Sequence, residues 1–287
     1  MEPSITKPVA KPWVIRDRQF IWGERTYIMG ILNVTPDSFS DGGQFNSRDA
    51  ALKQVTQMLP YIDILDIGGE STRPNAQPVS AAEEGDRILP IIEAIRAEYP
   101  NLPISVDTVK ASVASSAIAA GADMLNDVSA GRFDLDMLPL VGKLQVPIFV
   151  MHMQGEPRTM QANPHYRDVV QDVKQFLIDA ISVAKAWGIS PHLIAIDPGI
   201  GFGKTLEHNL ELIRNLSAFK TIKAPLLLGV SRKTFIGKLC DRPEPSDRLY
   251  GTIAACTACI AGGADILRVH DPQEIADACR VCDAIWR

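Results

Sequence analysis

Short apolar segments rich in branched residues recur along the chain, and a longer amphipathic segment follows each of them. The short segments have the length and composition of buried parallel strands, whereas the longer ones have helical spacing. The pattern predicts strands at 27–32, 62–67, 104–106, 124–125, 146–150, 193–196, 226–230 and 266–269. It predicts helices near 49–59, 81–98, 110–120, 134–141, 166–187, 206–216, 247–260 and 273–285.

The alternation predicts a parallel sheet, because every connection between strands is long enough to contain a helix. Eight strand–helix units predict an α/β fold of the (β/α)8 TIM barrel type in a single domain. An open, doubly wound sheet is the alternative, but the units are evenly spaced and contain no dinucleotide-binding fingerprint. We expect residues 1–20 to be a loose N-terminal tail, a short hairpin over 20–27 to extend the barrel, and 21–287 to form one catalytic domain.

Composition narrows the range of partners. The chain has 287 residues, a net charge of −5 and a hydrophobic content of 46%. Because no strongly basic region is present, we expect no nucleic-acid partner. The N-terminal segment has no apolar core, and the longest uncharged stretch, 251–264, is too short to span a bilayer. We therefore expect a soluble protein that does not bind membranes, located in the cytoplasm or, as the alternative, in an organelle matrix.

The segment LIAIDPGIGFGKT, residues 193–205, combines a predicted buried strand with a glycine-rich turn. Gly199 and Gly203 enclose three residues, one fewer than a phosphate-binding loop requires. Asp197 is therefore interpreted as a carboxylate at the end of a strand, beside a turn that lets a flat ligand approach the backbone. An ordinary strand-to-helix turn is the alternative.

Polar residues follow all eight predicted strands. In a barrel these strand ends meet at one mouth, so the residues together predict a ligand site, although helix capping could explain any one of them. Asp107, Asn126 and Asp197 would offer hydrogen-bond acceptors to a planar heterocycle with N–H donors, whereas the cationic side chains would bind an anion. Residues 33–48 and 68–80 carry several Gly and Pro residues and are candidate lids.

Four of the five cysteines form two Cys-x-x-Cys pairs, at 256–259 and 279–282. The spacing matches a zinc ribbon. Both pairs, however, lie in Ala-rich helical patterns without the Gly or Pro of a metal-binding knuckle. We therefore favour buried cysteines in a reducing compartment.

Together the strand-end motifs resemble those of a known family. The motifs are NVTPDSFSDGG, DIGGESTRP, SVDT, ND, MHMQG, DPGIGFGK, GVSRK and RVHD. In this order and spacing they are similar to the dihydropteroate synthases of folate biosynthesis, and the resemblance covers residues 29 to about 271. It implies a transferase, of a class targeted by sulfonamides, that joins 6-hydroxymethyl-7,8-dihydropterin diphosphate to 4-aminobenzoate, giving 7,8-dihydropteroate and diphosphate. It also implies bound Mg²⁺, a homodimer formed through the last helices, and departure of diphosphate before the amine attacks.

The resemblance also assigns residues to three parts of a site. Those implied for the pterin are Asp107, Asn126, Met151, Asp197, Phe202, Lys233 and Arg268. Those implied for the diphosphate are Asn33, Arg268 and His270, with Asn33 also a ligand of Mg²⁺. Those implied for 4-aminobenzoate are Phe39, Thr72, Arg73, Pro74 and Ser231. The catalytic set is Asp37, Lys233, Arg268 and His270, in which Asp37 would stabilise the cationic pterin methylene.

Some residues and functions stay open at this point. Asn75 stands where the family usually has Gly, and Asn tolerates the same left-handed turn. Asp41, Glu70 and Asp127 are interpreted as caps or loop anchors, and His165, His192 and His208 as surface residues. A corrinoid methyltransferase with the same pterin barrel and a non-catalytic pterin-binding protein are the alternative functions. The first lacks the NVTPDSFSDGG segment, and the second would be expected to lose the Arg-x-His pair.

Overall fold

The computed structural model describes residues 10–34, 44–71 and 78–287, and for 44–47 only the backbone. Its main sheet has eight parallel strands, ordered β8-β7-β6-β5-β4-β3-β10-β9. The strands are β3 (Tyr27–Asn33), β4 (Ile64–Gly68), β5 (Ile104–Asp107), β6 (Met124–Asp127), β7 (Ile148–Met151), β8 (Ile194–Asp197), β9 (Leu227–Leu228) and β10 (Ile266–Val269). A parallel bridge between Ile196 and Leu226 joins the two edge strands, so the sheet closes into a barrel.

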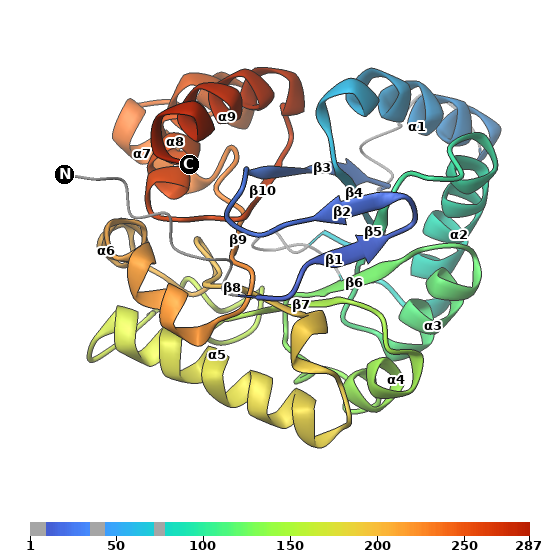
Figure 1. Ribbon diagram of the computed structural model, residues 1–287, viewed down its shortest axis with the longest axis horizontal. Coiled ribbons are helices and arrows are strands. Elements are labelled where there is room, and N and C mark those ends of the chain that lie inside the picture. The colour runs from blue at the N-terminus through green and yellow to red at the C-terminus, as the bar shows by residue number, and fades with distance from the viewer. Residues whose placement is uncertain (1–9, 35–43, 72–77) are drawn as a thin grey trace.

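Helices surround this barrel on its outside (Figure 1). They are α1 (Gln44–Met58), α2 (Ala81–Glu98), α3 (Ala111–Ala119), α4 (Met137–Leu144), α5 (Val169–Ala186), α6 (Leu206–Arg214), α7 (Thr234–Cys240), α8 (Leu249–Ala261) and α9 (Pro272–Trp286). The structure therefore confirms the predicted TIM barrel. Helix α7 was not predicted, because its seven residues are too few to show a helical period.

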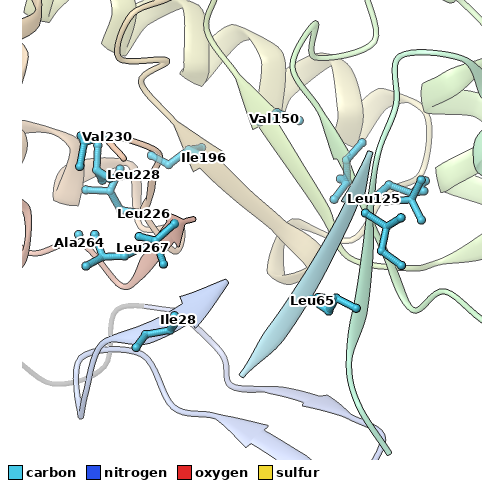
Figure 2. Close-up of a cluster of buried hydrophobic side chains, with 14 of the residues drawn as sticks. Ile28, Leu65, Leu125, Val150, Ile196, Leu226, Leu228, Val230, Ala264 and Leu267 are labelled. Carbon is cyan, nitrogen blue, oxygen red and sulfur yellow. The ribbon is translucent and has the colours of Figure 1, made fainter. Parts of the chain in front are cut away.

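Side chains alternate between the two faces of each strand, and the outward-facing ones form the larger core. Ile28, Leu65, Leu125, Ile196 and Leu267, each from a different strand, point away from the barrel axis and pack under the helices (Figure 2). The parallel strands are apolar on this face because helices cover all of it. Burial of this continuous apolar layer holds the helices to the sheet.

An antiparallel hairpin of β1 (Trp13–Ile15) and β2 (Arg18–Phe20) precedes the barrel. It lies across one end of the barrel (Figure 1), where Trp13, Phe20 and Trp22 pack with the inward-facing Phe149 and its neighbours. The predicted hairpin at 20–27 was therefore placed too late in the chain. The prediction of a loose tail over 1–20 was wrong from Trp13 onward, because burying two large aromatic rings fixes this segment to the barrel. Residues 1–9 lie outside the described part.

Candidate active site

The interior of the barrel changes from apolar to polar along its axis. The layer farther from the mouth contains Ile64, Met124, Phe149, Ala195, Leu227 and Ile266. Because every second residue of a strand faces the same side, the residue two places further along faces the interior one layer nearer the mouth. On five strands that residue is Asp66, Asn126, Met151, Asp197 and Arg268. An apolar floor thus supports a layer in which four of these five side chains are polar.

A network of ion pairs and hydrogen bonds joins β4, β5, β6 and β10 in this polar layer. Arg268 donates from Nε to Asp66 Oδ2 at 2.6 Å and from Nη2 to Asp107 Oδ2 at 2.8 Å. Asn126 donates from Nδ2 to the same Oδ2 of Asp66 at 3.1 Å. The structure therefore brings together three residues that the sequence assigned to the pterin, and adds Asp66 to them.

The electrostatics of this cluster are set by its burial. Desolvation raises the pKa of Asp107 to about 7, although the charge of Arg268 acts in the opposite direction. Burial alone would lower the pKa of Arg268, but attraction to Asp66 and Asp107 raises it. Arg268 is thus a fixed cation, whereas Asp107 can gain or lose a proton near neutral pH.

Asp197, Lys233 and Phe202 lie together on the other side of the mouth. Asp197 Oδ1 accepts the N–H of Gly199 at 2.7 Å, and burial raises the pKa of this carboxyl group. Lys233 Nζ donates to the carbonyl oxygen of Ile200 and lies 4.4 Å from the centre of the Phe202 ring. Burial lowers the pKa of Lys233 to about 8, although Asp197 opposes that shift. The three predicted residues thus lie close enough to line one pocket wall.

Glycine is required in the turn that follows Asp197. Gly199 has φ +68°, and a Cβ there would overlap the carbonyl oxygen of His152. The turn is also fixed by Lys204, which is 3% exposed and donates to His152 Nδ1 and to the carbonyl oxygen of Phe202, both at 2.9 Å. Burial lowers the pKa of His152 to about 2, so its neutral ring can accept this bond. Sequence reasoning did not assign Lys204 a role.

Methionine side chains lie near the polar layer of the barrel interior. Met151 belongs to a small buried cluster with Val128, Met153 and Met160, against which Phe202 packs. Flexible thioethers adapt their shape to a flat ring that they contact. The predicted apolar contacts Met151 and Phe202 therefore lie on one continuous surface.

His270 and Ser231 are hydrogen-bonded neighbours at the ends of β10 and β9. His270 Nδ1 lies 3.0 Å from Ser231 Oγ, which also accepts the backbone N–H of His270 at 3.2 Å. The sequence assigned His270 to the diphosphate and Ser231 to 4-aminobenzoate, so the two predicted subsites meet here. Asn33 is half-buried at the end of β3, whose register pairs it with Gly68 of β4.

Several predicted residues lie outside the described part of the chain: Asp37, Phe39, Asp41, Thr72, Arg73, Pro74 and Asn75. Glu70 anchors the start of the second candidate lid, because it accepts the N–H of Val79 at 3.0 Å and pairs with Lys110 at 2.5 Å. Asp127 faces outward and accepts the N–H groups of Ser129 and Gly131, as expected of a turn cap.

The remaining histidines and the cysteines are placed as follows. His165 and His192 are exposed, whereas His208 is only partly exposed and caps α6 together with Thr205. Cys256, Cys259, Cys279 and Cys282 are buried free thiols in the core beneath α8 and α9. Within residues 10–34, 44–71 and 78–287, no helix is long and apolar enough to cross a membrane.

Known proteins match this chain over the region that carries the strand-end motifs. Residues 29–270 match the family described as pterin binding enzyme. The chain is 49% identical over 277 residues to the dihydropteroate synthase of Synechocystis sp., covering 96% of each chain. It is 47% identical over 258 residues to that of Haemophilus influenzae, covering 90% of this chain and 93% of the relative.

Solved structures agree with these sequence relatives. A Yersinia pestis dihydropteroate synthase in a sulfonamide drug complex superposes with a TM-score of 0.89 at 40% identity, covering 96% of this chain and 99% of that one. The Xanthomonas albilineans enzyme with 4-aminobenzoic acid superposes with a TM-score of 0.89 at 42% identity, covering 98% of both chains.

Proposed function

Because this chain belongs to the family of pterin-binding enzymes, and most of its length matches dihydropteroate synthases, we infer that it is a dihydropteroate synthase. It is then a transferase of folate biosynthesis. It joins 6-hydroxymethyl-7,8-dihydropterin diphosphate to 4-aminobenzoate, and the products are 7,8-dihydropteroate and diphosphate. The relatives named above give no support to a corrinoid methyltransferase or to a non-catalytic pterin-binding protein.

The single observation in the structure that carries this proposal is the polar layer above the apolar floor of the barrel. A pterin edge presents several N–H donors, for which the oxygens of Asp107, Asn126 and Asp197 are suitable acceptors. Arg268 uses the edge of its guanidinium group for Asp66 and Asp107, so a face of the group can stack on the ring. Met151 and Phe202 would contact the ring from the apolar side.

For the diphosphate, we propose binding by Arg268, His270 and Asn33, with Mg²⁺ held partly by Asn33. Mg²⁺ is commonly bound by one or two protein oxygens together with substrate phosphates and water. The half-buried amide of Asn33 at the barrel mouth fits that requirement. When bound, Mg²⁺ would stabilise the charge of the departing diphosphate. Arg268, whose pKa is raised, would supply a permanent positive charge to the same group.

We propose that the arylamine binds beside Ser231 and that Phe39, Thr72, Arg73 and Pro74 contribute to its site. Because diphosphate leaves first in this scheme, no nucleophilic side chain is needed. Asp37 would then stabilise the cationic methylene of the pterin. Relatives solved with 4-aminobenzoic acid and with a sulfonamide drug support an arylamine pocket in this family.

The assay that tests the function is release of diphosphate by the purified chain with both substrates and Mg²⁺. We expect continued release over many turnovers to require 4-aminobenzoate, which captures the pterin cation, to stop when a chelator removes Mg²⁺, and to be inhibited by a sulfonamide. A chain that binds the pterin but releases no diphosphate under these conditions would be a non-catalytic pterin-binding protein, contrary to the proposal.

We also propose that the protein is a cytoplasmic homodimer. Large apolar side chains are exposed on the last three helices, which are neighbours in Figure 1: Leu239, Tyr250, Val281, Ile285 and Trp286. Apolar side chains gathered on one side of a protein mark an interaction surface. All five cysteines are free thiols, which is typical of proteins in a reducing compartment such as the cytoplasm.

A further inference from the structure

Asp66 is a buried acid in the middle of β4, and it is not among the residues that the family motifs assign to a substrate. Asp66 is 0% exposed, and its side chain faces the barrel interior between the apolar floor and the mouth. A charge is costly at such a depth unless it is paired and hydrogen-bonded. Its Oδ2 is paired, with Arg268 and Asn126, but its Oδ1 has no hydrogen-bond partner among the described residues.

Neutralising Arg268 does not by itself explain this acid. Asp107 already provides a carboxylate to the same guanidinium group at 2.8 Å. A second buried carboxylate with an unsatisfied oxygen adds a desolvation cost that one ion pair would not require. A buried polar atom that is left without a hydrogen-bond partner therefore calls for a physical explanation.

What Asp66 adds is orientation. An ionised carboxylate only accepts hydrogen bonds, so the end of the Asn126 amide that faces it must be the NH2 group. The amide oxygen of Asn126 is then left for another donor. Asp66 also fixes Nε of Arg268 while Asp107 fixes Nη2, and two such bonds set the plane of a rigid guanidinium group.

We propose that Asp66 is a positioning residue of the pterin pocket, which orients the Asn126 amide and the Arg268 guanidinium for the ring. The proposal rests on the function inferred above. It explains why one oxygen atom of Asp66 serves two side chains that come from strands on either side of β4. Asp66 itself touches neither substrate in this scheme, and its effect on binding passes through Asn126 and Arg268.

The first test replaces the charge without changing the shape. Binding of 6-hydroxymethyl-7,8-dihydropterin to the full chain is measured by calorimetry for the wild type and Asp66→Asn. Because an amide can face Asn126 with either end, we expect the affinity to fall by about tenfold or more. The Michaelis constant for 4-aminobenzoate should change by less than about threefold, because Asp66 lies on the pterin side.

Ser105 provides a matched control. It stands opposite Asp66 in the register of β4 and β5, is fully buried, and its Oγ has no hydrogen-bond partner among the described residues. Ser105→Ala therefore changes a buried polar group at the same depth. Unlike Asp66, this group makes no hydrogen bond to a described residue of the pterin pocket. We expect its pterin affinity to equal that of the wild type. A similar loss in both variants would show that Asp66 acts only through packing, and would overturn the proposal.

An exchange of the two side chains separates positioning from general damage. Asn126→Asp alone sets two carboxylates against each other and should bind the pterin poorly. Asp66→Asn combined with Asn126→Asp restores the net charge of the pair and one donor and one acceptor between the strands, and a carboxylate oxygen again faces the ring. Arg268 loses its acceptor at Nε but keeps the bond from Nη2 to Asp107. We expect the double variant to bind at least about tenfold more tightly than Asn126→Asp. Equal or weaker binding would overturn the proposal, even if Asp66→Asn alone fails to fold.

Failure of the positioning role of Asp66 can be distinguished from failure of the proposed enzymatic function. Diphosphate release by the wild type tests the function, whereas the comparisons among variants test Asp66. An active wild type with an unaffected Asp66→Asn variant would reject the positioning role alone. A wild type that binds the pterin without turnover would reject the activity and leave the binding comparisons valid.

Discussion

At the scale of single residues, the Asp197 carboxylate divides its two oxygens between the protein and the proposed ligand. Oδ1 accepts the N–H of Gly199, which fixes the group and leaves Oδ2 for the pterin edge. The neighbouring Lys233 keeps a cation close to it. This arrangement explains why a carboxylate at the end of a buried strand is suited to recognise N–H donors.

We predict that Asp197→Asn weakens pterin binding by about 2–5 kcal/mol, because one acceptor becomes a donor that opposes a ligand N–H group. Calorimetry with the pterin substrate measures the change. Asp179→Asn, an exposed position on α5, is the control and should bind as the wild type does. Near-native affinity in Asp197→Asn would mean that another residue anchors the pterin.

A second residue-scale prediction concerns pH. The pKa of Asp107 is about 7 in the free protein, whereas an N–H donor of the pterin needs the ionised carboxylate. The ligand therefore binds the deprotonated form, and affinity should rise with pH until the pH passes about 7, with release of a proton on binding. Lys233, with a pKa near 8, loses its charge above that value, so affinity should decline again.

Calorimetry of pterin binding in two buffers of different ionisation enthalpy measures the proton release. In Asp107→Asn the rise of affinity toward neutral pH should disappear, while the decline at higher pH should persist. If the wild type binds at pH about 6 without releasing a proton, the carboxyl group of Asp107 does not titrate in this range, and the prediction is wrong.

At the scale of elements, one lysine connects three segments beside the barrel mouth. Lys110 precedes α3 and pairs with Glu70, which follows β4, and with Glu84 of α2. Glu84 is fully buried, and its Oε1 has no hydrogen-bond partner among the described residues. Because Glu70 also accepts the Val79 N–H, this group holds both ends of the second candidate lid. We name Glu70, Glu84 and Lys110 the lysine clasp.

We predict that Lys110→Met lowers the free energy of unfolding by about 3–5 kcal/mol, because it leaves Glu84 buried without its cation. Urea denaturation measures the change. Lys110→Met combined with Glu84→Gln should recover part of the loss, since the uncompensated charge is gone. Arg280→Met is the control: its pair with Asp277 is exposed, and its loss should cost no more than about 0.5 kcal/mol. Equal losses in the two single variants would contradict a structural role of the lysine clasp.

At the scale of the whole molecule, the two ends of the barrel differ. The hairpin and its aromatic rings close one end, whereas the polar layer opens at the other. The outer side of the helices faces solvent, and we propose that a second copy packs on the exposed apolar side chains of α7, α8 and α9. Assembly there would leave the barrel mouth accessible only if the interface stays on the outer side of these helices.

We predict that Tyr250→Asp combined with Val281→Asp converts the proposed dimer into a monomer, because charges would be buried in an apolar interface. Light scattering after size-exclusion chromatography measures the mass. Leu135→Asp is the matched control, because Leu135 is 81% exposed but lies outside α7, α8 and α9, and its mass should not change. A wild-type protein that is monomeric at micromolar concentration would reject the dimer itself.

Hydrophobic periodicity is a local property of the chain, so it was enough to predict the order of the barrel strands and of the helices other than α7. All eight strands were predicted, and the polar residues at their ends, such as Asp197 and His270, could be assigned to one mouth from topology alone. The roles of these residues came from a resemblance carried by many motifs together. The hairpin was predicted too late in the chain, because its aromatic residues are buried only by contact with the end of the barrel that they cover, and a local pattern does not show that contact.

Contacts between side chains of different strands, in contrast, could be identified only in the folded protein. Arg268 and Asp66 are separated by 202 positions, and their contact depends on the pairing of β10 with β3, which in turn pairs with β4. The one signal in the sequence was an acid inside the otherwise apolar strand Ile64–Gly68. That signal shows a costly charge but not its partner, since neither the depth of a side chain nor its neighbours on other strands follows from a local pattern.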